Sequence, residues 1–202
     1  MRPPAIDPPG KWLAFAAGYV VFCGLYLLTG RIHPLTVSPS PALFIDRLIP
    51  FVPPTVWIYY TQFFFLPASV WTLKTTNNAG RTLYSMALAS AVSFCVFVLY
   101  PTTLPRPLIH SGDLTAVAFR LLYSIDSDSN CVPSLHVALA CLGARGMMEE
   151  NTRAGAFGVV WAGLISISTM TTKQHYLVDV ISGACVAVVC FSLVKRWFVK
   201  AQ

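Results

Sequence analysis

The chain has 202 residues and a formal net charge of +6, and only 11% of its residues are charged, against roughly 25% in typical globular proteins. Apolar residues make up 55% of the total, and the mean hydropathy is +0.63. This composition excludes a disordered chain and a small disulfide scaffold. Because the basic residues are spread along the chain, no nucleic-acid partner is expected, and the length fits one domain over residues 1–202.

The predicted elements, taken in chain order, begin with an irregular tail at residues 1–10, which hold four prolines. A membrane-spanning helix needs about 20 mostly apolar residues. Six later stretches meet or approach this length, which predicts an all-α, six-span transmembrane helical bundle: residues 12–29, 55–73, 82–105, 132–148, 154–172 and 176–194. Pro101 is expected to end the third helix early. Residues 41–51 fit either a short interfacial helix or an ordinary loop.

The charges of the loops predict how these spans are oriented. An even number of spans places both termini on the same side of the membrane. Lysine and arginine are more frequent on that side than in the opposite loops, so the termini and the tail are expected to be cytoplasmic. The chain is therefore predicted to be a multi-pass membrane protein, in the inner membrane if its source is a bacterium.

Ionisable groups inside or beside a span are costly and point to a functional site. His175 and Asp179 are four residues apart at the start of the last span, so on a helix their side chains share one face. A carboxylate that accepts the imidazole Nδ1–H leaves the other ring nitrogen free as a nucleophile or base. The alternative is an interfacial histidine beside a chance acidic neighbour.

The segment Pro133-Ser134-Leu135-His136 has the pattern of a helix start, with Pro133 at the first helical position. Free backbone N–H groups there, with the Ser134 hydroxyl, could hold a phosphate oxygen, and His136 could protonate a leaving oxygen. The alternative is a loop-to-helix boundary whose histidine reaches the membrane interface.

Two cations lie at the same predicted ends of the spans. Arg106, between two prolines, offers a planar fork to two phosphate oxygens, and Lys173 precedes His175 by two residues. Each alone also fits an interfacial anchor. Two histidines, one acid and two cations at the outer face together form a set suited to phosphoryl transfer. Since no acidic cluster suited to a two-metal site is present, no metal and no other cofactor are expected.

The combined motifs resemble those of the type-2 phosphatidic acid phosphatase superfamily over residues 99–183. Arg106-Pro107 is similar to the end of the family's first signature. Pro133-Ser134-Leu135-His136 is similar to its second signature, Pro-Ser-Gly-His. His175 and Asp179 match its third signature, and Ser168 stands where that signature has a serine.

The chain departs from the family pattern at three positions. Leu99 and Thr169 stand where the family has a lysine and an arginine, and Leu135 replaces the glycine of the second signature. Lys173 is available to replace one of the missing cations. This variant pattern resembles the branch that includes sphingolipid and inositol phosphotransferases and many bacterial lipid phosphatases.

The resemblance implies a metal-independent lipid phosphatase whose substrate is a lipid phosphate or diphosphate on the outer side of the bilayer. In that mechanism His175, oriented by Asp179, attacks phosphorus, and His136 protonates the departing oxygen. Arg106, Lys173 and Ser134 stabilise the phosphoryl charge. Water then hydrolyses the phosphohistidine.

Two other functions remain open from the sequence. An alcohol in place of water would make the protein a lipid phosphotransferase. A proton-coupled transporter, in which the histidines carry protons, is a third and non-enzymatic reading. The motifs do not identify the lipid, the acceptor or the oligomeric state.

Residues outside the motifs carry further expectations. Because every motif falls in the last four spans, the first two are expected to shape the lipid entrance. The aromatic residues of the second span, among them Trp57 and Tyr59, are expected to contact lipid and anchor the interface, with substrate recognition as the alternative. Asp126 and Asp128 are expected to be solvated residues of an outer loop.

Overall fold

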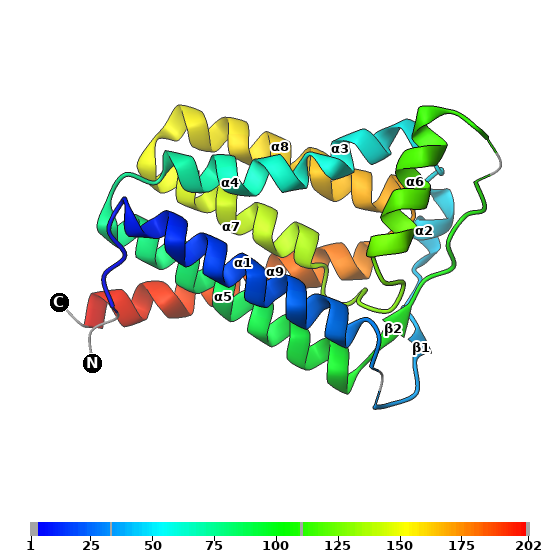
Figure 1. Cartoon of the computed structure of the whole chain (residues 1–202), viewed down its shortest axis with the longest axis horizontal. Helices are drawn as coiled ribbons and strands as arrows, with labels where there is room; N and C mark the ends of the chain where they lie inside the picture. The colour runs from blue at the N-terminus through cyan, green and yellow to red at the C-terminus, as the bar shows by residue number, and fades with distance from the viewer. Residues whose placement is uncertain (1–3, 33, 110, 201–202) are drawn as a thin grey trace.

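The computed structural model describes residues 4–32, 34–109 and 111–200, and shows long helices lying side by side (Figure 1). Within these residues the helices are α1 (Gly10–Thr29), α2 (Phe44–Leu48), η1 (Pro53–Thr55), α3 (Val56–Tyr60), α4 (Gln62–Thr72), α5 (Thr76–Leu99), α6 (Leu114–Ile125), α7 (Leu135–Glu150), α8 (Thr152–Thr171) and α9 (Leu177–Lys200). Two short strands, β1 (Ser38–Pro39) and β2 (Thr102–Thr103), form one parallel pair. The chain is therefore mostly helical, as predicted, with a small strand pair that the sequence did not suggest.

Four helices, α1, α5, α8 and α9, are long and apolar enough to cross a membrane. Their outward faces carry large apolar side chains, such as Val188 and Phe157, which are 67% and 58% exposed. Apolar side chains exposed along a whole bundle are stable only in contact with lipid. These helices thus indicate a membrane protein.

The other two predicted spans differ from simple long helices. The second is divided at Thr61 into α3 and α4, and the Thr61 hydroxyl donates to the Ile58 carbonyl, a local bond that competes with the regular helical ladder. The fourth predicted span is α7, which has 16 residues and is the most buried helix, lying between its neighbours in Figure 1. Since α8 supplies the lipid-facing surface beside it, α7 needs no long apolar exterior.

The third predicted helix ends early, as expected, but it begins six residues before the predicted start at residue 82, and the first begins two residues before the predicted start at residue 12. α5 ends at Leu99, two residues before Pro101, and α1 begins at Gly10 after the non-helical residues 4–9. Residues 1–3 of the predicted tail lie outside the described part of the chain. α1 begins and α9 ends at the same end of the bundle (Figure 1).

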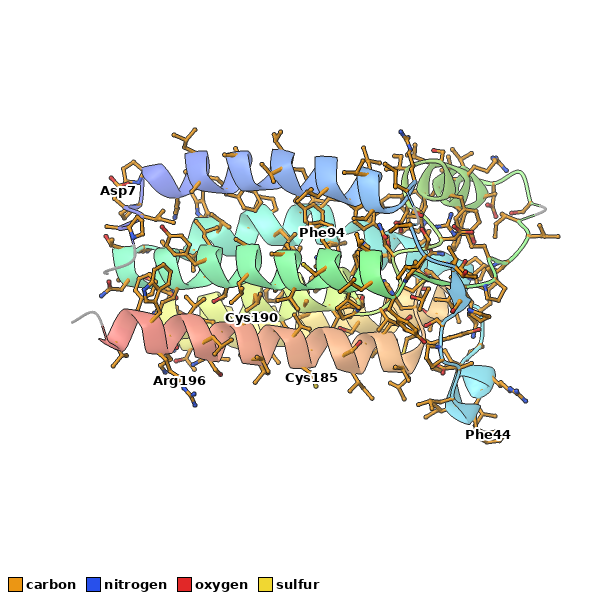
Figure 2. All side chains as sticks on the ribbon, turned by 90° about the horizontal axis from the view of Figure 1, so that it is seen from below. Asp7, Phe44, Phe94, Cys185, Cys190 and Arg196 are labelled. Carbon is orange, nitrogen blue, oxygen red and sulfur yellow. The ribbon has the colours of Figure 1, made fainter. Side chains whose placement is uncertain are left out.

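The opposite end of the bundle carries the short elements. α2 forms within the segment 41–51, and Figure 2 shows its Phe44 at the end opposite Asp7 and Arg196. α6, which the sequence analysis treated as part of a loop, lies across this end (Figure 1). Its buried Phe119 and Leu122 pack against Val56 and Tyr59. The short elements therefore form a cap over the ends of α3, α7, α8 and α9.

Candidate functional site

The predicted site residues lie under this cap, on three connections between helices. Arg106 follows α5, Ser134 and His136 mark the start of α7, and Lys173 and His175 lie between α8 and α9. The structure places these residues at one end of the bundle, and the contacts described below show which of them it brings together.

His175 and Asp179 form the predicted i, i+4 pair. The His175 Nδ1 lies 3.3 Å from the Asp179 Oδ2, and the two side chains are 6% and 0% exposed. The same Oδ2 accepts a hydrogen bond of 2.8 Å from the Tyr176 backbone N–H, so Asp179 also satisfies the first turn of α9. With Nδ1 facing the carboxylate, Nε2 is the ring nitrogen of His175 left for a substrate.

Ser40 is a further hydrogen-bond partner of Asp179 that was not predicted from the sequence. Its hydroxyl donates to the Asp179 Oδ1 at 2.8 Å, and both side chains are buried. The β1–β2 pairing fixes this contact, since the Ser40 backbone N–H donates to the Thr103 carbonyl at 2.9 Å. A serine 139 positions earlier in the chain offers no local pattern from which this partnership could be recognised.

The start of α7 lies directly against α9. Ser134 caps the helix by accepting from the Val137 N–H at 3.4 Å, and its own N–H donates to the Asp179 carbonyl at 3.0 Å. Pro133 stands one position before this cap rather than at the first helical position, which is Leu135. The helix therefore begins two residues later than predicted. The arrangement brings the His136 and His175 ring centroids to 5.8 Å.

Gly183 permits the close approach of α7 to α9. A Cβ at this position would lie 2.4 Å from the Ser134 carbonyl oxygen, a backbone atom that cannot turn aside. Gly183→Ala is therefore expected to separate the two helices, with a loss of about 1–3 kcal/mol in the free energy of unfolding. Displacement of His136 relative to His175 is expected to reduce any catalytic activity by up to about 10²-fold.

The matched control is Gly163→Ala on α8, where a Cβ would meet no atom within 4 Å. Thermal unfolding and turnover of both variants provide the measurement. If Gly183→Ala behaved like Gly163→Ala in both assays, the close approach of α7 to α9 would have no functional importance.

The two predicted cations line one small cavity with His175. The Arg106 guanidinium donates to the Asp126 carbonyl at 3.0 Å and lies 4.7 Å from the centre of the Tyr123 ring. Lys173 has a positive φ of 57°, and its ammonium group donates a hydrogen bond of 3.2 Å to the Asp46 carbonyl. The Lys173 ammonium also donates to the Ile49 carbonyl, so one N–H group of Lys173 and further N–H groups of Arg106 remain to meet an anion.

Asp126 is a second residue that the sequence analysis missed. The half-buried Asp126 carboxylate accepts hydrogen bonds from the Tyr26 hydroxyl and, at 2.9 Å, from the Tyr59 hydroxyl. The buried Tyr59 ring in turn lies 4.5 Å from the His136 ring. The expectations of a solvated Asp126 and a lipid-facing Tyr59 are therefore wrong, because α6 folds back over α3 and encloses both residues.

The cavity also contains a thiol, and the described residues offer no metal site. Burial, with the nearby carboxylate of Asp179, raises the pKa of the Cys131 thiol well above its usual value, so the thiol stays protonated. Across residues 4–32, 34–109 and 111–200, no three His, Cys, Asp or Glu side chains gather closely enough to hold a metal ion. The ionisable groups at the site, among the described residues, include two imidazoles, the carboxylates of Asp179, Asp126 and Asp128, two cations and the Cys131 thiol.

Comparison with known proteins places the chain in a family. The PAP2 superfamily model matches residues 35–193, which is most of the chain, and the protein therefore belongs to the PAP2 superfamily. This confirms the resemblance and extends it from α5 back to the loop before α2. A search of curated proteins gives no match.

One similar solved structure is that of LpxE from Aquifex aeolicus. The TM-score is 0.52 at 15% sequence identity, and the similarity covers 85% of this chain and 92% of that chain. At this identity the likeness establishes a shared helical fold.

Proposed function

We propose that the protein is an integral-membrane lipid phosphatase that hydrolyses a lipid phosphate or diphosphate through a phosphohistidine. The observation that carries this proposal is the placement of two imidazoles with ring centroids 5.8 Å apart, one of them bonded to the buried Asp179. Membership of the PAP2 superfamily and the apolar helices support a phosphatase that acts on a membrane lipid. The substrate partner is then a lipid phosphate within the bilayer.

In the first step the Nε2 of His175 attacks phosphorus and the bond to the lipid oxygen breaks. His136 donates a proton to that departing oxygen. The Nδ1 of His175 keeps its proton, which stays hydrogen-bonded to the Asp179 carboxylate. Arg106 and Lys173 are placed to neutralise the phosphoryl oxygens, because both line the cavity that contains His175. Ser134 contributes by fixing the start of α7, and with it His136.

In the second step the now neutral His136 takes a proton from water, which attacks the phosphohistidine. The N–P bond breaks, inorganic phosphate leaves, and both histidines return to their initial protonation states. No metal ion takes part in this scheme.

We propose six membrane spans, with α3 and α4 together forming the second and α7 the fourth. The excess of lysine and arginine at the end where α1 begins and α9 ends supports a cytoplasmic location for that end. The site would then face the periplasm or a lumen, and in a bacterium the protein would lie in the inner membrane.

The test is phosphate release from a panel of lipids by the purified protein, with and without a strong chelator. The expected result is release from at least one lipid, with a rate that EDTA changes by less than about twofold, since no step needs a metal ion. Loss of activity on chelation, restored by a divalent cation, would contradict the metal-independent scheme. No release from any lipid would contradict the hydrolase itself.

Transfer to an alcohol is the second candidate, supported by the departures at Leu99 and Thr169 from the phosphatase pattern. The chemistry differs only in the group that attacks the phosphohistidine. The same assay, supplied with a labelled phospholipid and either ceramide or diacylglycerol, distinguishes the two. A new labelled lipid indicates transfer, and free phosphate indicates hydrolysis.

A further inference from the structure

Two apolar cavities lie along the inner face of α1. The first, of about 190 Å³, is enclosed by α1, α3, α4, α6 and α7, and the second, of about 430 Å³, lies mainly between α1 and α5. Four of the lining side chains are common to both cavities, so the two adjoin one another: Tyr19, Phe22, Leu66 and Leu139. We call the two together the α1 crevice.

The loose packing of α1 accounts for this space. Only 6% of the apolar window of α1 is buried, against 39% in α5 and 33% in α8. Four aromatic rings on α1, those of Phe15, Tyr19, Phe22 and Tyr26, stack one above the next with centroids 5.8–6.2 Å apart. These rings face the bundle, where the Phe22 ring centroid lies 5.6 Å from that of Phe94, and form one wall of the crevice.

One end of the α1 crevice is the candidate site. The lining surfaces of both cavities are almost entirely apolar. His136 and Asp126 line the first cavity beside Tyr26 and Tyr59, whereas no described carboxylate, histidine or basic side chain lines the second. From Leu27 to Ala14, the outermost α1 residues that line the crevice, the helix rises by about 20 Å, or somewhat more than half of the roughly 30 Å hydrocarbon core. The crevice therefore runs from the site to a depth of about one leaflet.

The apolar lining of the crevice favours a hydrocarbon chain as its ligand. The apolar second cavity offers few polar partners for ordered water, and an empty cavity forfeits the packing contacts of its walls. Inside a bilayer the group available to fill it is a hydrocarbon chain. A chain that lies in the crevice brings its own headgroup to the end where His136 is found.

We infer that the α1 crevice binds one hydrocarbon chain of the phosphorylated lipid and so places its phosphate between His136 and His175. The chain can belong to a diacyl lipid or to a polyprenyl lipid, since both present the same apolar surface. The inference rests on the proposed function for the reaction that follows binding, but the binding itself does not require turnover.

Gly18 gives a means of closing the crevice without disturbing the site. It lines the second cavity, and a Cβ there would meet no atom within 4 Å. Gly18→Trp is therefore expected to fill the space that the chain would occupy. The matched control is Gly24→Trp, on the same helix, where a Cβ also meets nothing and the residue lines neither cavity.

The kinetic measurement compares dipalmitoyl phosphatidate with dibutyryl phosphatidate, whose chains are too short to enter the second cavity. For Gly18→Trp the ratio of the two kcat/KM values is expected to fall about tenfold or more, and for Gly24→Trp to stay within about twofold. A long-chain polyprenyl diphosphate forms the third arm. A loss with either long-chain substrate supports the inference and identifies the chain, and an unchanged ratio for both overturns it.

A binding measurement separates this inference from the proposed function. A phosphatidate with a diazirine near the end of one chain, photolysed with the protein in nanodiscs, is expected to label α1 or α5 residues of the crevice, less so in Gly18→Trp than in Gly24→Trp. Crevice labelling by a protein that releases no phosphate would support the inference and contradict the phosphatase. Labelling spread evenly over the lipid-facing helices would overturn the inference whatever the activity.

Discussion

His175→Ala is expected to lower phosphate release by roughly 10⁴-fold or more, because it removes the atom that attacks phosphorus. No other described imidazole can take its place, since His136 is held at the start of α7, with its backbone carbonyl bonded to the Gln62 amide at 3.2 Å. The measurement is the initial rate with the preferred lipid. Ser192→Ala is the control on the same helix, because its exposed hydroxyl donates only to the Val188 carbonyl of its own turn.

His136→Ala provides the mechanistic contrast. With an aryl phosphate, whose leaving group needs no proton, this variant is expected to form the phosphohistidine and to hydrolyse it slowly, since no base activates water. An alkali-stable, acid-labile phosphate bound to the protein should therefore accumulate in His136→Ala and be absent from His175→Ala. Activity of His175→Ala within tenfold of the parent protein would end the proposal of a phosphohistidine.

The positions of the helices could be predicted from the sequence because the membrane acts as a uniform apolar solvent. Long uncharged stretches have one stable arrangement there, and the hydropathy of residues 154–172 predicts α8 to within two residues at each end. The break at Thr61 and the cap formed by α6 depend instead on side-chain contacts with distant segments. No local hydropathy encodes those contacts.

The candidate site divides in the same way. His175 and Asp179 could be paired from sequence because helical geometry alone brings positions four apart together. Ser40 contacts Asp179, 139 positions further along the chain. Asp126 contacts Tyr59 and Tyr26, which precede it by 67 and 100 positions. Their partnerships exist only once β1 pairs with β2 and α6 folds over α3, so they could be found only in the folded structure.

Asp179→Asn is expected to give a folded protein whose turnover falls by about 10²–10³-fold. Two donors, the Tyr176 N–H and the His175 Nδ1–H, face the Oδ2 of Asp179, and one donor, the Ser40 hydroxyl, faces its Oδ1. In the asparagine variant the amide oxygen must therefore occupy the Oδ2 position. The amide NH₂ then faces Ser40, whose hydroxyl can turn to accept.

The histidine keeps its tautomer in this variant, and what is lost is the negative charge that stabilises the imidazolium formed during phosphoryl transfer. Loss of the tautomer as well costs about 10⁴-fold in enzymes where the amide turns the other way. Asp179→Ala removes the acceptor entirely, so it is expected to reach that larger loss. It also leaves buried N–H groups unpaired, at about 1–3 kcal/mol each in the free energy of unfolding.

Ser40→Ala separates the role of charge from that of packing around Asp179. It leaves the carboxylate and both donors to Oδ2 in place, so turnover is expected to fall by about tenfold or less while stability drops by about 1 kcal/mol. The kcat values of the three variants should therefore rank Ser40→Ala above Asp179→Asn, and Asp179→Asn above Asp179→Ala, and Asp179→Ala should have the lowest unfolding midpoint. A kcat of Asp179→Asn equal to that of the parent protein would mean that the buried charge contributes nothing to the reaction, and that the Asp179 side chain serves only to hold Ser40 and the start of α9 in place.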